Sequence, residues 1–98
     1  MTTLPTLTGT GKQIAWATDL RAQRQREMEA RRADYERQAT IALGKRRTTE
    51  VEVAEGLAHV DAVTADILAH PEASWWIEQR QNSVVQLMRE VSLRLQAQ

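Results

Sequence analysis

The sequence of residues 73–80, Ala73-Ser74-Trp75-Trp76-Ile77-Glu78-Gln79-Arg80, holds two of the three tryptophans of a 98-residue chain that has one tyrosine and no phenylalanine. A buried tryptophan removes roughly 200 Å² of surface from water, so these side chains dominate the predicted core. Adjacent residues on a helix point about 100° apart, so Trp75 and Trp76 cannot both face one core. We therefore expect one to pack inward and the other to lie at the margin, with Trp16 and Leu68 joining the same cluster.

Three helical segments surround and include this stretch. Residues 12–43 contain no Pro or Gly and are rich in strong helix formers. A second helix is expected to end near residue 69 and a third to run from about 71 to 95, loosened at residues 82–83. Short connections favour antiparallel neighbours. The sequence therefore predicts an all-α fold, a three-helix up-down-up bundle with a long first helix. Residues 1–10 are expected to form a flexible N-terminal arm, and residues 11–98 a single helical domain.

Helix ends are marked by residues that satisfy free backbone groups. Thr8 or Thr10 is the expected N-cap of the first helix, and Thr48 or Thr49 that of the second. Gly44 is the expected left-handed residue that ends the first helix. Gly56, inside the second helix, leaves two interpretations open: a loss of about 1 kcal/mol relative to Ala, or the close approach of another helix.

Charge is unevenly distributed although the net charge is zero. Residues 21–47 carry nine basic and four acidic side chains, whereas residues 48–98 carry eight acidic and three basic ones. Two interpretations remain open: a basic face that meets an acidic partner, or halves that complement each other within the fold or a dimer. A first helix longer than its neighbours would expose Met28 and Tyr35 unless a second chain covered them. We therefore predict a homo-oligomer, namely a dimer.

The two helix starts that contain tryptophan are the candidates for a partner-binding surface. An arginine follows each by about one turn, and Arg21 or Arg80 at that position can stack on an indole face. The competing interpretation is that all of these side chains form core. The predicted partner-binding residues are Trp16, Arg21, Trp75, Trp76 and Arg80.

Nucleic-acid binding is the alternative function. Basic side chains along one helix and at its end can contact phosphates without reading bases. Acidic residues in the same stretch dilute this charge, and no helix-turn-helix spacing is evident. The residues that would carry this function are Lys12, Arg21, Arg24, Arg31, Arg32, Lys45, Arg46 and Arg47.

Other chemistry finds little support in the sequence. The chain has no cysteine and only two histidines, His59 and His70, so we expect no metal site. Residues 9–12, Gly-Thr-Gly-Lys, lack the preceding strand and the following Ser or Thr of a phosphate loop. No nucleophile–base–orienter set is apparent, so we expect neither cofactor nor catalysis. No membrane span or signal peptide is evident, so we expect a cytoplasmic protein with no membrane partner.

Two segments resemble a pair found together in uncharacterised small bacterial proteins that are often carried by phages and plasmids. Residues 9–21 are similar to a GxxKQIxWAxxIR segment, with Leu20 in place of Ile. Residues 73–80 are similar to ASWWIDNR, with Glu78-Gln79 in place of Asp-Asn. The match covers about a quarter of the chain. The resemblance implies a mobile-element setting and assigns no activity.

These observations favour a non-enzymatic helical adaptor or inhibitor that binds another macromolecule, most simply another protein. The resemblance alone suggests a host defence protein as its target. The alternative is a sequence-tolerant nucleic-acid-binding accessory protein that uses the Arg-rich first helix.

Overall fold

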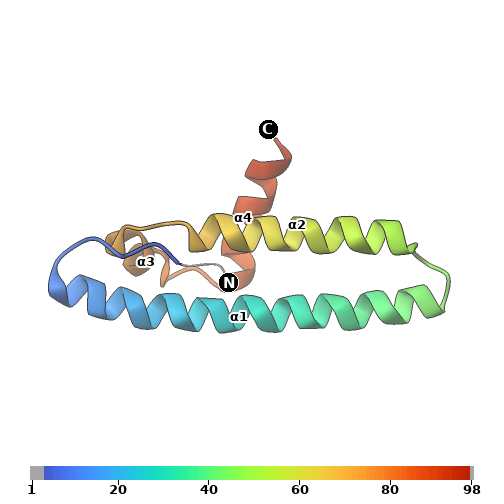
Figure 1. The fold of residues 1–98 in the computed structure, drawn as a ribbon, viewed down its shortest axis with the longest axis horizontal. Helices are drawn as coiled ribbons and strands as arrows, with labels where there is room; N and C mark the ends of the chain where they lie inside the picture. The colour runs from blue at the N-terminus through green and yellow to red at the C-terminus, as the bar shows by residue number, and fades with distance from the viewer. Residues whose placement is uncertain (1–3, 98) are drawn as a thin grey trace.

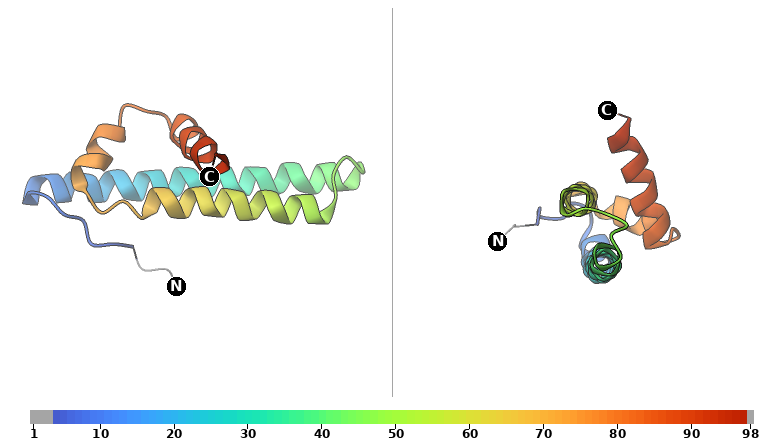
Figure 2. Two further views of the ribbon diagram at one scale, coloured as in Figure 1. Left: turned by 90° about the horizontal axis from the view of Figure 1, so that it is seen from above. Right: turned by 90° about the vertical axis from the view of Figure 1, so that its right-hand side faces the viewer.

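The computed structural model describes residues 4–97, and within them the chain forms four helices and no β-strand. They are α1 (Gly11–Gly44), α2 (Glu50–Leu68), α3 (Ala73–Gln79) and α4 (Val84–Gln96). The prediction of an all-α fold is confirmed. Helices α1 and α2 form an antiparallel hairpin that sets the 52 Å length of the molecule, and α4 crosses this hairpin near its middle (Figures 1 and 2). None of the helices is both long and apolar enough to cross a membrane.

The two hairpin helices begin at the predicted threonines. Thr10 and Gln13 form a capping box: the Gln13 backbone N–H donates to Thr10 Oγ1 at 3.2 Å, and the Thr10 N–H donates to Gln13 Oε1 at 3.0 Å. Thr49 Oγ1 accepts from the Glu52 N–H at 3.2 Å and caps α2. Each bond satisfies a backbone donor that the first turn of a helix leaves free.

The C-terminal end of α1 differs from the prediction. Gly44 is still helical, and the residue with positive φ is Arg46, at 57°. The Arg46 N–H donates to the Leu43 carbonyl at 3.1 Å, and the Arg47 N–H donates to the Ala42 carbonyl at 2.9 Å. These two bonds form a Schellman motif, in which the left-handed position falls two residues later than the glycine.

The predicted third helix is two helices, so the three-helix bundle becomes four helices. The chain turns at residues 80–83, where Ser83 Oγ accepts from the Gln86 N–H at 3.1 Å and starts α4. Helix α4 then crosses the hairpin, which lets Leu87 and Val91 reach the core; they are 2 % and 7 % exposed. If α3 and α4 formed one straight helix along the hairpin, α4 would not cross it.

The core lies in one half of the hairpin, between α1, α2, α3 and α4. Its buried apolar residues are Leu7, Ala17, Met28, Val63, Ile67, Ala73, Trp76, Leu87 and Val91. Met28 is only 1 % exposed within the single chain, so the prediction that it needs a second chain to cover it is wrong. The physical reason is that α2 lies alongside α1 and α4 crosses both (Figure 2).

The part of the predicted N-terminal arm that the structure describes, residues 4–10, is extended and contacts the start of α3. The Thr8 N–H donates to the Pro71 carbonyl at 2.8 Å, and the Ala73 N–H donates to the Thr8 carbonyl at 2.9 Å. These bonds seat Leu7 in the core. Gly9 follows with φ of 142°, where a Cβ would lie 3.2 Å from Ala73 Cβ, so glycine suits this close approach.

Gly56 marks a close approach between the two hairpin helices. A Cβ at this position would lie 1.8 Å from the Tyr35 hydroxyl oxygen, which is inside van der Waals contact. Of the two interpretations offered by the sequence, the helix-approach interpretation therefore holds. The Tyr35–Gly56 contact fixes the register of α1 against α2 in the half of the hairpin that is remote from α3.

Candidate protein-binding site

Trp76 is the tryptophan that packs inward. It is 1 % exposed, and its indole Nε1–H donates to the His70 carbonyl at 3.0 Å. The Trp75 ring lies edge-on to it, with ring centres 4.9 Å apart and planes at 88°. The hydrogen bond satisfies the one polar group of the buried indole, so Trp76 is a core residue.

Trp75 is the marginal tryptophan, as expected from the helical angle between neighbours. It is half-buried and lies flat on the His70 ring, with ring centres 3.7 Å apart and planes at 2°. It also lines a shallow cleft of about 230 Å³ between α3 and α4, together with Leu87 and Arg94. The imidazole therefore covers one face of the half-buried indole.

Trp16 lies on the first turns of α1 and is 47 % exposed. The Arg80 guanidinium carbon lies 5.0 Å from the centre of its ring, a cation–π contact that joins α3 to α1. No ring-to-ring contact between Trp16 and Trp75 or Trp76 occurs within residues 4–97. The expectation that Leu68 packs in the same cluster as the tryptophan pair is confirmed, whereas the expectation that Trp16 joins this cluster is wrong. Trp16 lies on the opening turns of α1, and Arg80 rather than a second ring contacts it. We name Trp16, Arg80 and the exposed Lys12, one turn earlier on α1, the Trp16 patch.

Arg21 and Arg24 have internal hydrogen-bond partners. Arg21 donates to the Pro5 carbonyl at 2.7 Å and holds the N-terminal segment against α1. Arg24 is 8 % exposed and donates from one nitrogen to the carbonyls of Gln79, at 2.9 Å, and Asn82. Glu27 lies 3.8 Å from Arg24, and its Oε1 is buried without a hydrogen-bond partner. Arg24 therefore fixes the turn between α3 and α4 and is inaccessible to a phosphate.

Arg32 is the third arginine with internal partners. It donates to Asp61 on α2 at 2.7 Å and also pairs with Glu36 one turn along α1. The hydrogen bond from Arg32 is the main reason why the pKa of the Asp61 carboxyl lies below its usual range. This surface pair links the two hairpin helices, and charge pairing within the fold is one of the two interpretations that the sequence left open.

The remaining residues predicted to bind nucleic acid are exposed but separated. Lys12 lies on the first turn of α1, Arg31 near its middle, and Lys45, Arg46 and Arg47 at the connection to α2. These places span the length of the hairpin (Figure 1). The fold therefore does not bring the eight predicted basic residues together on one surface.

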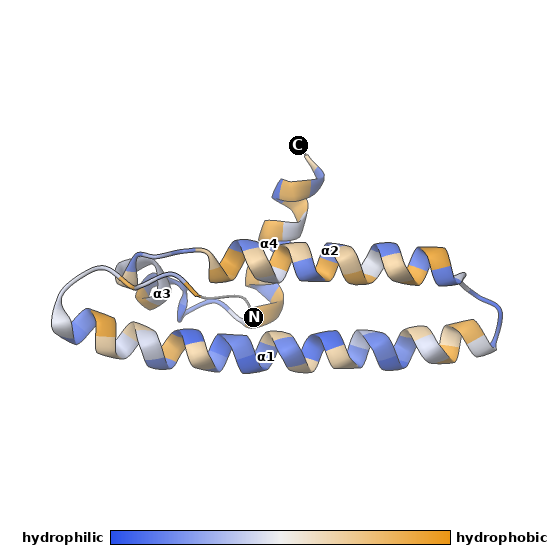
Figure 3. Ribbon diagram, in the orientation of Figure 1, coloured by the Kyte–Doolittle hydropathy of each residue, from blue (hydrophilic) through white to orange (hydrophobic). Residues whose placement is uncertain are grey.

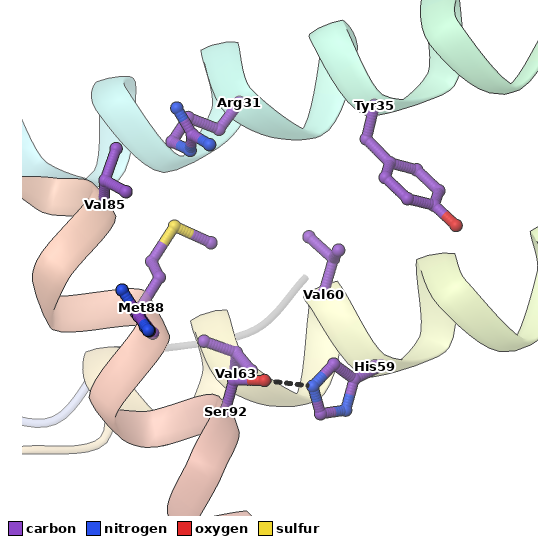
Figure 4. Close-up of a pocket in the computed structure, with 9 residues that line it drawn as sticks. Arg31, Tyr35, His59, Val60, Val63, Val85, Met88 and Ser92 are labelled. Carbon is purple, nitrogen blue, oxygen red and sulfur yellow. Dashed lines mark hydrogen bonds between the residues drawn. The ribbon is translucent and has the colours of Figure 1, made fainter.

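A cleft that sequence patterns do not reveal lies where α4 crosses the hairpin (Figure 4). It has a volume of about 280 Å³ and is lined by Arg31, Tyr35, His59, Val60, Val63, Val85, Met88, Arg89 and Ser92. His59 Nε2 and Ser92 Oγ lie 2.6 Å apart, although 33 residues separate them in the chain. No carboxylate is among the lining residues, so the His–Ser pair lacks the third group of a hydrolytic triad. The pair links α2 to α4.

Within residues 4–97, no group of three or more His, Cys, Asp or Glu side chains is arranged to hold a metal ion. Comparisons of the chain with protein-family models, with curated proteins and with solved structures found no match.

Proposed function

We propose that this protein is a non-enzymatic helical adaptor or inhibitor that binds another protein through the Trp16 patch. The observation that carries the proposal is the half-exposed indole of Trp16 beneath the Arg80 guanidinium. Tryptophan and arginine are the residues most enriched among the side chains that dominate binding energy at protein interfaces. In a chain with only three tryptophans, this one remains at the surface while Trp76 is fully buried.

The rigid support of the patch is consistent with this role. Arg80 ends α3, whose turn into α4 is held by Arg24, and Trp16 lies on the opening turns of α1 beside the Thr10 capping box. An interface side chain that is already ordered before binding loses less conformational entropy on association. A partner surface that presents an apolar residue beside a carboxylate would complement both the indole and the cations of the patch.

The proposal includes a cytoplasmic setting, a dimeric protein and a mobile-element context, with a host defence protein as one target. A dimer carries two Trp16 patches and is therefore bivalent, which raises its apparent affinity for a multimeric target. Nucleic-acid binding is less well supported, because Arg21, Arg24 and Arg32 have partners within the fold.

The test is affinity capture from a bacterial lysate with the full chain as bait. Trp16→Ala and Arg80→Ala are compared with Leu93→Ala, which removes a 57 % exposed apolar side chain from α4 at a distance from the patch. We expect a captured protein to be lost with Trp16→Ala, reduced at least tenfold with Arg80→Ala, and retained with Leu93→Ala. Circular dichroism of each variant shows whether it is folded.

Two outcomes would contradict the proposal. One is a captured protein whose recovery is the same for Trp16→Ala and the unaltered chain. The other is tight binding of labelled DNA or RNA that falls steeply with salt concentration, because that dependence is the signature of phosphate contacts.

A further inference from the structure

The half of the hairpin remote from α3 contains no buried residue. Among residues 4–97, every buried side chain belongs either to residues 7–28 or to residues 63–91, and all of residues 29–62 are half-buried or exposed. We name this part the distal half. The Cα radius of gyration is 15.4 Å, whereas a compact chain of this length has about 13 Å. Beyond the crossing of α4, the distal half is two helices thick, and a helix pair normally needs another layer to bury its apolar stripe.

One face of the distal half is open between α4 and the hairpin connection. The cleft beneath α4 and a second cleft of about 220 Å³, lined by Tyr35, Gln38, Ala39, Ala42, Thr48 and Val53, have Tyr35 in common. We name these two clefts together the seam. Apolar residues occur on both helices at the end of the hairpin (Figure 3), and Val85 of α4, 47 % exposed, borders the seam on one side.

The charges along the seam are segregated by sign. Arg31 and Arg89 line the cleft near α4, with no carboxylate among its lining residues. Glu52 and Glu55 are exposed and precede His59, another lining residue, by seven and four residues, which places them on its face of α2 nearer the hairpin connection. Within residues 4–97, none of these four charged residues has an ion-pair partner. Asp34, which follows Arg31 by three residues on α1, already pairs with Arg37 at 2.6 Å.

We propose that a second copy of this chain packs antiparallel across the seam, so that Arg31 and Arg89 of each copy face Glu52 and Glu55 of the other. The geometry follows from the Tyr35–Gly56 contact. Arg31 lies four residues before Tyr35, and Glu52 lies four residues before Gly56 on the antiparallel helix, so they are displaced by about 6 Å in opposite directions. A two-fold axis through this contact, perpendicular to both helices and in the plane of the interface, therefore brings Arg31 of one copy level with Glu52 of the other along the hairpin.

The arrangement is self-complementary, as a two-fold interface must be. The distal halves of the two copies together form a four-helix layer, and each α4 flanks the hairpin tip of the other copy. This layer removes water from the seam, including Tyr35, Ala42 and Val53. The Trp16 patch lies at the other end of the hairpin and stays free. The inference therefore specifies the interface of the dimer that is part of the proposed function, and it does not depend on partner binding through the Trp16 patch.

The test uses two charge-reversed variants and measures mass by light scattering over a concentration series. The acidic variant carries Arg31→Glu and Arg89→Glu; the basic variant carries Glu52→Arg and Glu55→Arg. We expect the unaltered chain to have twice the chain mass, and each variant alone to have the chain mass because like charges then face each other. An equimolar mixture of the two should regain twice the chain mass, because every pair across the interface is again opposite in sign.

A matched control carries Arg26→Glu and Arg37→Glu, which make the same change in net charge at two exposed positions on the outer face of α1. It should remain a dimer. A monomeric unaltered chain, variants that still dimerise alone, or a mixture that stays monomeric would each overturn the inference. A monomer that captures a protein through Trp16 would overturn only the dimer, whereas a charge-dependent dimer with no captured protein would overturn only the proposed function.

Discussion

At the scale of single residues, the backbone conformation of Arg46 departs from what its side chain prefers. Its φ of 57° lies in the left-handed region, where a Cβ meets the following carbonyl oxygen at a cost of roughly 1–2 kcal/mol. The sequence places a glycine two residues earlier, at Gly44, and this misled the prediction of the helix end. The register is instead decided by where the chain must turn to reach the Thr49 cap of α2.

We expect Arg46→Gly to raise the free energy of unfolding by about 1 kcal/mol, because glycine adopts this conformation without the Cβ contact. Urea unfolding followed by circular dichroism at one fixed protein concentration measures the change. The neighbouring Arg47→Gly serves as the control, since Arg47 has no positive φ, and it should not stabilise the protein. A value for Arg46→Gly at or below that of the unaltered chain would count against the Schellman geometry.

The Arg32–Asp61 pair leads to a prediction about the stability of the protein at acidic pH. Since the pKa of Asp61 is lower in the folded chain than in the unfolded one, the ionised carboxylate favours the folded state. This contribution is complete above the unfolded pKa, which is about 4, and is lost as the pH falls through the folded pKa. We expect Arg32→Met to return the Asp61 pKa toward the ordinary aspartate value and to remove this part of the acid sensitivity. An NMR titration of the Asp61 carboxyl checks it; an unchanged pKa in Arg32→Met would refute the assigned cause.

At the scale of elements, much of the helical structure could be predicted from the sequence. The caps at Thr10 and Thr49 follow from local chemistry, and the all-α fold from helical periodicity and composition. The sequence predicted a loosened helix at residues 82–83 but not a break between two helices. The break depends on the hydrogen bond from Arg24 to the Gln79 carbonyl, two residues that are 55 positions apart in the chain. The burial of only one of the two adjacent tryptophans, Trp76, could be predicted because neighbouring residues on a helix point about 100° apart. The His59–Ser92 contact was not, since α4 must cross α2 before they meet.

Arg24 should therefore act as a tie between α1 and the α3–α4 turn. We expect Arg24→Met, which keeps an apolar stem, to lower the free energy of unfolding by about 2–3 kcal/mol, because carbonyls of Gln79 and Asn82 lose a charged donor. Arg26→Met, at an exposed position, should change it by no more than about 0.5 kcal/mol. Urea unfolding measures both. Equal effects of the two substitutions would show that the buried guanidinium does not hold the turn.

At the scale of the whole molecule, the α1–α2 hairpin extends well beyond the buried core. The proximal half is completed by the N-terminal segment, α3 and α4, and it holds the ten residues that are buried in the described part of the chain, Arg24 among them. The distal half carries the seam, across which we propose that a second copy packs, while the Trp16 patch lies at the opposite end. If both proposals hold, assembly and recognition are separated by about half of the 52 Å length, so a substitution at one end should leave the other intact.

The pairing of Thr8 with Pro71 and Ala73 also has a consequence for how the protein is made. Leu7 leaves the ribosome before the backbone partners that seat it, which are synthesised more than sixty residues later. The nascent chain can form the α1–α2 hairpin while translation continues, because those contacts link consecutive segments. The segment that carries Leu7 stays unpaired until residue 73 has emerged, so closure of the core waits for the tryptophan pair.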